Sequence, residues 1–256
     1  MAQFNLLVET PATFVDLVAV ALAHPCANHP LFEVLRTTSL NSQRAGAFLR
    51  NYDAHASVLR RLLLKAAAIM PEEAVGFILE NVRTEFGAGD INARHQLQLI
   101  DLALQAGVTQ QEFDRFKIRA GIRSFIKAVS QFYYPHGTGE TRVSSYAKPA
   151  STGVYSHSTS KRYYRPAIAA GAITATEVLA IEEFKAMQVA FSSLGLQDHI
   201  WFDHVTVEAD HTEESLALAQ YFMKTDEDVA AVLHGLNGVL DANVSLYDGL
   251  LSALQG

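Results

Sequence analysis

The chain has 256 residues, of which 49% are hydrophobic and 18% charged, so it is long and apolar enough to bury a sizeable core. Its formal net charge of -7 disfavours nucleic acids and anionic membranes as partners, because both repel an acidic protein. Cys26 is the single cysteine, the N-terminus lacks a basic signal-peptide segment and no apolar run approaches the length of a membrane span, so we expect a cytoplasmic protein without a disulfide.

Almost the whole chain is predicted to be helical, because apolar residues recur every three or four positions and capping residues precede several of these segments. The expected helices span 11–24, 29–36, 41–70, 71–86, 90–107, 109–133, 166–194, 198–223 and 225–251. No strand, repeat or linker is predicted. We therefore expect a single all-α domain over residues 1–256, with about seven to nine helices.

Residues 135–163 differ from the rest, since they are rich in Ser, Thr, Gly and Tyr and have no helical period. A loop of this length within a compact domain is usually a lid, a binding loop or disordered. Basic and tyrosine side chains at its exit are candidates to clamp a substrate carboxylate: Arg162, Tyr163, Tyr164 and Arg165. A solvated basic loop is the simpler alternative.

The strongest functional signal is a stripe of three side chains at 204, 208 and 211. At about 100° per residue on a helix, Glu208 lies about 40° from His204, and His211 lies about 20° from it on the other side. Two imidazoles and a carboxylate on one stripe form half of a transition-metal site. A solvated polar face is the alternative, but apolar residues such as Trp201 and Val205 flank the stripe.

Two further segments offer partners for this half-site. Glu177 lies in an otherwise uncharged run of small and apolar residues, where a carboxylate is either paired in an internal salt bridge or bound to a metal. Glu85 and His95 flank the glycines at 87 and 89, and a chain reversal there would bring His95 back toward Glu85.

Together the candidate metal ligands suit two iron or manganese ions: Glu85, His95, Glu177, His204, Glu208 and His211. A ferritin-like bundle is disfavoured, because it uses two Glu-x-x-His motifs and this chain has one, at 208–211.

These segments resemble those of the heme-oxygenase-like diiron oxidases, a family also described as iron-containing redox enzymes and including CADD-like proteins. The resemblance rests on Asn-x-x-x-Glu-x-Gly-x-Gly-Asp-x-x-x-x-His at 81–95, Glu177 in its small-residue helix, and the stripe at 204–211. The segments at 29–32 and 246–250 are also similar to the family's opening and closing helices. The family usually has Asp where this chain has Glu208.

The resemblance implies a heme-oxygenase-like helical bundle that binds two Fe(II)/Fe(III) ions, with manganese as the alternative metal. It also implies a non-heme diiron oxygenase or oxidase that uses O2 on a small amine, amino-acid or fatty-acid-like substrate, by N-oxygenation or oxidative C–C cleavage in a biosynthetic pathway. Glu177 and Lys185 are the candidate catalytic residues. A homodimer is left open.

Two alternatives stand beside this interpretation. One is a metal-free enzyme of the same superfamily, similar to TenA-type thiamin-degrading hydrolases or to the cofactorless oxidase of quinone-cofactor biosynthesis. The hydrolases need a cysteine well inside the chain, and only Cys26 is present. The other is a non-catalytic helical interaction protein.

Overall fold

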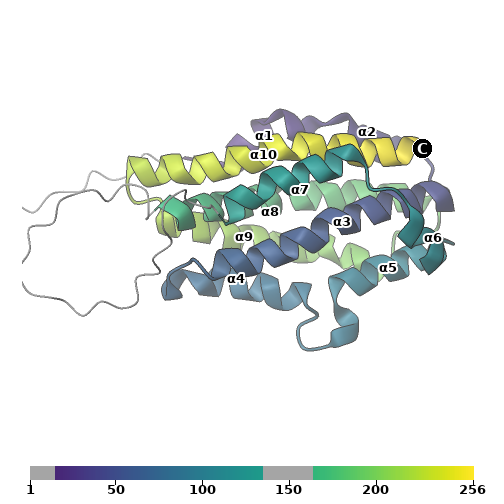
Figure 1. Cartoon of the computed structure of the whole chain (residues 1–256), viewed down its shortest axis with the longest axis horizontal. Coiled ribbons are helices and arrows are strands. Elements are labelled where there is room, and N and C mark those ends of the chain that lie inside the picture. The colour runs from purple at the N-terminus through teal and green to yellow at the C-terminus, as the bar shows by residue number, and fades with distance from the viewer. Residues whose placement is uncertain (1–14, 135–163) are drawn as a thin grey trace, which may run out of the picture.

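The computed structural model describes residues 15–134 and 164–256, except for the side chains at 164–165 and 206–209. Within these residues the chain forms ten α-helices and three short 3-10 helices and has no strand (Figure 1). The helices are α1 (Leu17–Ala23), η1 (Pro25–Asn28), α2 (Pro30–Thr37), α3 (Ser42–Ala67), α4 (Glu72–Glu85), η2 (Ile91–Ala93), α5 (His95–Gln105), α6 (Gln110–Arg115), α7 (Ala120–Tyr133), α8 (Tyr164–Ser192), η3 (Ile200–Asp203), α9 (His204–Phe222) and α10 (Asp226–Gln255). The predicted loop at 135–163 lies outside the described residues.

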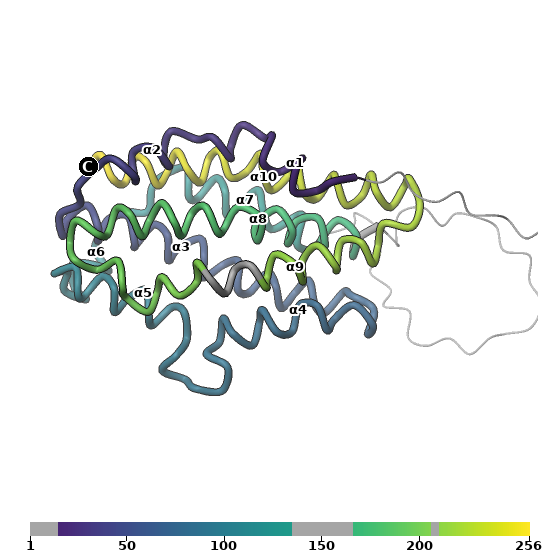
Figure 2. Tube along the Cα trace, turned by 180° about the vertical axis from the view of Figure 1, so that it is seen from behind, coloured from purple at the N-terminus to yellow at the C-terminus, as the bar shows by residue number. Residues whose placement is uncertain are grey.

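The helices stack in layers along the long axis of the bundle. α10 lies with α1 and α2 on one side, α4 and α5 lie on the opposite side, and α3, α7, α8 and α9 run between them (Figures 1 and 2). α8 contacts both α10 and α9, and α4 contacts α9 and α3. Buried apolar side chains from Leu17 in α1 to Leu254 in α10 form one contiguous core. The prediction of an all-α bundle is therefore confirmed.

Helix starts lie close to the predicted capping residues. Thr109 and Glu112 form a capping box at the start of α6, and Thr225 forms another with Asp228 at the start of α10. Asp90 accepts a hydrogen bond from the backbone of Asn92, so it caps the short η2 and not the longer helix that was expected.

The predicted helix over 109–133 is divided into α6 and α7, and Asn51 of α3 accounts for the division. Its side-chain oxygen accepts a hydrogen bond of 2.7 Å from the backbone N–H of Arg119, and its amide donates one of 3.1 Å to the carbonyl of Lys117. These tertiary bonds satisfy backbone groups that a continuous helix would have paired internally. The apolar periodicity within 109–133 could not predict this division, because Asn51 lies in another helix.

α8 and α10 touch backbone to backbone at two glycines. A Cβ atom placed on Gly171 would lie 1.9 Å from the carbonyl oxygen of Val232, and one on Gly235 would lie 1.9 Å from that of Ile168. Only glycine permits such an approach at these two positions. The crossing therefore fixes the position of α8, the helix that also carries Glu177.

By length and composition alone, α10 could span a membrane, although no apolar run of that length was expected from the sequence. Its buried residues include Val232, Leu236, Val239 and Leu240. They pack against α8, α7 and α3, as expected for the core helix of a globular protein.

Candidate functional site

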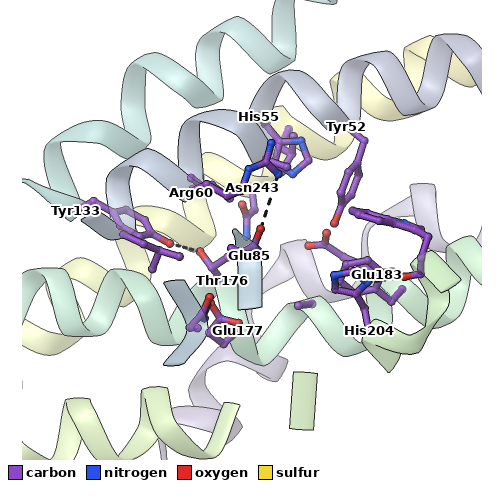
Figure 3. Close-up of a pocket in the computed structure, with 18 residues that line it drawn as sticks. Tyr52, His55, Arg60, Glu85, Tyr133, Thr176, Glu177, Glu183, His204 and Asn243 are labelled. Atoms are coloured by element: carbon purple, nitrogen blue, oxygen red, sulfur yellow. Dashed lines mark hydrogen bonds and ion pairs between the residues drawn. The ribbon is translucent and has the colours of Figure 1, made fainter. Parts of the chain in front are cut away.

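A cavity of about 80 Å³ lies inside the bundle, lined by residues of α3, α4, α7, α8, α9, α10 and η3. A buried water occupies about 10–15 Å³ on this measure, so the cavity has room for a few waters or the head group of a small ligand. Asn81 lines it, and further polar side chains enter it from several helices, as Figure 3 shows: Tyr52, His55, Arg60, Glu85, Glu177, Glu183, His204 and Asn243.

Three of the predicted ligands contact one another at the edge of this cavity, which Glu85 and His204 line and His95 does not. His95 Nδ1 lies 3.2 Å from Glu85 Oε1 and 2.8 Å from His204 Nε2. The turn between α4 and α5 makes the first contact possible, because Gly87, Ala88 and Gly89 all have positive φ and reverse the chain. The prediction that this break returns His95 to Glu85 is confirmed.

The tautomer of His204 is set by its own helix start. Its Nδ1 donates a hydrogen bond to the carbonyl of Trp201, so the lone pair of Nε2 faces His95. A histidine that binds a metal usually donates its other ring N–H to a carbonyl or carboxylate in this way. Burial first, and then His95, lowers the pKa of His204 to about 4, so the ring is neutral at neutral pH.

Glu85 is held in its ionised form. Burial alone would raise its pKa, but the hydrogen bond and electrostatic interaction with His95, together with the Arg60 guanidinium, keep the pKa of this carboxyl below its ordinary value. Arg60 is itself buried, and its Nη1 lies 3.8 Å from Glu85 Oε2. The site therefore presents a carboxylate beside two imidazoles.

Glu177 is 6% exposed and enters the same cavity from α8. Its Oε1 accepts a hydrogen bond of 2.9 Å from Asn81 Nδ2, and its backbone carbonyl accepts one of 3.1 Å from Thr212 Oγ1. Asn81 and Glu85 are one helical turn apart on the same face of α4. This face therefore supplies Glu85 as a ligand and, through Asn81, a hydrogen bond to the ligand Glu177.

His211 is buried and lies against α4 as well, but it does not line the cavity. Its Nε2 is 3.2 Å from Thr84 Oγ1. The side chain of Glu208 is outside the described part of the chain, so its role as a metal ligand stays a prediction.

The residues fit a metal ion in the chemistry of their donor atoms, and two distances between donor atoms are close to those between neighbouring ligands of one ion. Two donor atoms that each lie about 2 Å from one ion, in adjacent positions, are about 3 Å apart, close to the 3.2 and 2.8 Å between the donor atoms of Glu85, His95 and His204. Here these atoms contact one another, and within the described residues no group of three or more His, Cys, Asp or Glu is arranged around a metal position.

Lys185 is not brought into the site. It is exposed and forms an ion pair of 2.9 Å with Glu182 on the outside of α8. Eight residues along a helix rotate the side chain about 80° from Glu177, which directs it away from the cavity. The expectation that it approaches the reacting centre is corrected. Arg162 and Tyr163, and the side chains of Tyr164 and Arg165, lie outside the described residues.

The sequence analysis missed a second polar group in the cavity, centred on Glu183. The hydroxyl of Tyr247 on α10 donates a short hydrogen bond to Glu183, and the hydroxyl of Tyr52 on α3 donates another. Figure 3 shows Tyr52 and Glu183 directed at each other, on the side of the cavity where His204 lies. The sequence offered only a weak signal, because Glu183 lies between Glu182 and Phe184 in the same largely apolar helix as Glu177.

Burial raises the pKa of Glu183 to about 7, against the hydrogen bonds from Tyr247 and Tyr52, and the nearby charge of Glu177 adds to the rise. Cys26 lacks the exposure and the low thiol pKa of a nucleophilic cysteine. It is fully buried, and burial with the charge of Glu183 raises its pKa to about 12.

A family model matches the sequence, and several solved structures share the fold. The model of a family described as iron-containing redox enzymes matches residues 46–244. A CADD-like protein of unknown function from Nostoc punctiforme is similar with a TM-score of 0.66 and 14% identity, over 93% of this chain and 95% of its own. Comparison with curated proteins gives no match.

Two more solved structures have the same architecture. A domain of unknown function with a heme oxygenase-like fold from Shewanella denitrificans is similar with a TM-score of 0.65 and 15% identity, over 95% of both chains. A TenA homolog from Pseudomonas syringae has a TM-score of 0.63 and 13% identity, over 94% of this chain and 90% of its own. At these identities the likeness establishes the fold, which is heme oxygenase-like, as the resemblance predicted.

Proposed function

The chain belongs to the family of iron-containing redox enzymes, and from that premise we propose that it is a non-heme diiron enzyme that uses O2 to oxidise a small amine, amino-acid or fatty-acid-like substrate. The observation that supports this most directly is the contact of Glu85, His95 and His204 at the cavity that Glu177 also enters. Carboxylates and neutral imidazoles are the donors that iron and manganese take.

The proposed ligands are Glu85, His95, Glu177, His204, Glu208 and His211. Bound iron would supply the electrons that activate dioxygen. The chain's own task is to hold these groups in ionised or neutral form before the metal arrives. Arg60 and His95 keep Glu85 ionised, and burial keeps His204 neutral.

Other side chains orient the ligands and keep the cavity dry. Asn81 fixes the direction of the Glu177 carboxylate, and the Trp201 carbonyl fixes the tautomer of His204. The apolar part of the lining includes Leu59, Leu63 and Leu246. Exclusion of water strengthens every electrostatic contact inside such a site.

The test is anaerobic loading with Fe(II), removal of unbound metal, and a count of iron per chain, followed by exposure to O2 with optical and Mössbauer detection. We expect two irons and an oxygen-dependent spectral change. His204→Ala should lose at least one iron. Asp210→Ala is the matched control, because Asp210 is exposed on the same helix and should leave iron binding unchanged.

A wild-type chain that binds no iron would contradict the proposal and favour a metal-free enzyme or an interaction protein. The metal-free alternative stands because a TenA homolog has the same fold. Its cysteine-dependent form is disfavoured here, because the thiol of Cys26 is buried, with a pKa near 12.

A further inference from the structure

The part of the cavity around Glu183 combines a carboxyl group with aromatic rings. Tyr52 and Tyr247 both donate hydrogen bonds to this carboxyl group, which it accepts best in its ionised form. No cation pairs with Glu183 among the described residues that line the cavity. Arg60 is the one such residue with a fixed positive charge, and it lies 3.9 Å from Asp53 and 3.8 Å from Glu85.

Three aromatic side chains line the cavity beside Glu183. The ring centroids of Tyr52, Phe184 and Trp201 are 5.5 to 6.3 Å apart, so the three form one cluster. Aromatic faces attract an ammonium group through their negative π-surfaces, and the effect is larger where the site is desolvated. A carboxylate beside such a cluster is a typical environment for an alkylammonium ion.

One buried nitrogen atom beside this cluster, Trp201 Nε1, has no hydrogen-bond partner among the described residues, and Trp201 lines the cavity with an exposure of only 2%. His55 also lines the cavity, and its ring is hydrogen-bonded to the backbone of Asn51. Buried polar groups are normally paired, so unpaired ones that line a cavity indicate a missing ligand or water. Burial lowers the pKa of His55 to about 3, so its ring is neutral and does not repel a cation.

We propose that Glu183, with Tyr52 and the neighbouring aromatic rings, is the subsite that binds the ammonium group of a small alkylamine substrate. This inference rests on the proposed function for the reaction, but the subsite binds its ligand without metal. An ammonium group supplies the missing positive charge to Glu183. A carboxylate placed there would meet a second buried negative charge, so the subsite selects amines over acids.

The small volume of the cavity also limits the ligand. About 80 Å³ accepts a head group with a few carbon atoms and not a long chain. n-Propylammonium is therefore a suitable probe, and 1-propanol and propionate are its neutral and anionic counterparts of similar size.

In the experiment, the full chain is titrated with each of the three probes, both without iron and after iron loading, and tryptophan fluorescence reports binding. Trp201 is the single tryptophan and lines the cavity, so a saturable change reports on this site. We expect n-propylammonium to bind at least about tenfold more tightly than 1-propanol or propionate, a difference of about 1.4 kcal/mol.

Glu183→Gln should lose at least about tenfold in affinity for n-propylammonium, whereas Glu183→Asp, which keeps the charge, should still prefer the amine. Glu182→Gln is the matched control, because Glu182 is the adjacent residue and pairs with Arg36 and Lys185 outside the cavity. It should bind as the wild type does. Circular dichroism establishes that each variant is folded.

The subsite is overturned if n-propylammonium causes no saturable change in the wild type, if 1-propanol binds as tightly, or if Glu183→Gln binds the amine normally. Failure of the proposed function gives a different result. A chain that binds no iron but keeps amine selectivity would retain the subsite and lose the diiron mechanism, and a chain that binds iron without amine selectivity would do the reverse.

Discussion

The two sides of α8 make contact by different means. Toward α10 the contact at Gly171 and Gly235 is apolar and fixed by shape, since these glycines bring the two backbones together, and farther along α8 the hydroxyl of Tyr247 donates a hydrogen bond to Glu183. Toward α4 and α9 it is polar: Asn81 hydrogen-bonds to the carboxylate of Glu177, and Thr212 hydrogen-bonds to its carbonyl.

This difference separates stability from function along one helix. Close packing of backbones tolerates no added atom, so the α8–α10 side holds the helix in place. The side that faces the cavity contains carboxyl groups whose burial costs free energy and which a metal or a cation would compensate. Substitutions on the first side should unfold the protein, whereas substitutions on the second should change what it binds.

The largest effect is expected at the glycine crossing. Gly171→Ala or Gly235→Ala should lower the free energy of unfolding by about 1–3 kcal/mol or more, because the new methyl group would overlap a backbone carbonyl. Gly76→Ala is the control, since Gly76 is exposed in α4 with no neighbouring atom within 4 Å. It should be neutral or stabilising by about 0.4–1 kcal/mol. Urea denaturation measures all three, and equal losses would refute the packing argument.

On the polar side, Glu177→Gln should remove iron while the fold persists. A neutral amide is a poor ligand for a hard cation, and the substitution removes a buried charge, so the melting temperature should not fall. Iron content and the thermal midpoint are measured on the same sample. Full iron occupancy in this variant would exclude Glu177 as a ligand.

Asn81→Leu tests the residue that orients Glu177. Loss of an orienting hydrogen bond around a metal site typically weakens metal affinity about 10–100-fold. We expect a loss in this range, smaller than that of Glu177→Gln. Competition with a chelator gives the affinity. Unchanged affinity would mean that α4 contributes only Glu85 to the site.

Glu183 predicts a pH dependence of stability. Its pKa is about 7 in the folded chain and 4.5 in an unfolded chain, so between these values the folded state keeps a proton that the unfolded state has released. Its contribution is therefore present below pH 4.5 and lost as the pH rises through about 7. Glu183→Gln should be more stable than the wild type above pH 7, by at most about 3 kcal/mol, at 1.36 kcal/mol per unit. A difference that does not vary between pH 5 and 8 would contradict the raised pKa.

Lys185→Ala should have the smallest effect. Lys185 is exposed and pairs only with Glu182 among the described residues, and such surface pairs contribute about 0–1 kcal/mol. Iron content, oxygen consumption and stability should all stay close to wild type. A large loss of activity without loss of iron would place Lys185 in catalysis after all.

The sequence predicted the site best where its geometry is local. The return of His95 to Glu85 follows from the positive φ of the glycines between them, whereas the position of His211 outside the cavity could not be predicted from helical spacing. Lys185 was misplaced because closeness in sequence to Glu177 was taken as closeness in space. Glu183 was missed because its hydrogen-bond partners, Tyr52 and Tyr247, come from helices far away in the chain.

By itself the sequence determined the helical class, most helix boundaries and the type of donor that the site offers, since periodicity, capping and side-chain chemistry are local properties. Tertiary structure alone decided which carboxyl groups share the cavity and which helix Asn51 interrupts. These outcomes depend on contacts between residues far apart in the chain, such as Tyr52 and Glu183, which are 131 positions apart (183 minus 52). Only packing of the whole bundle brings such residues together, because burial and hydrogen bonding must be satisfied for all helices at once.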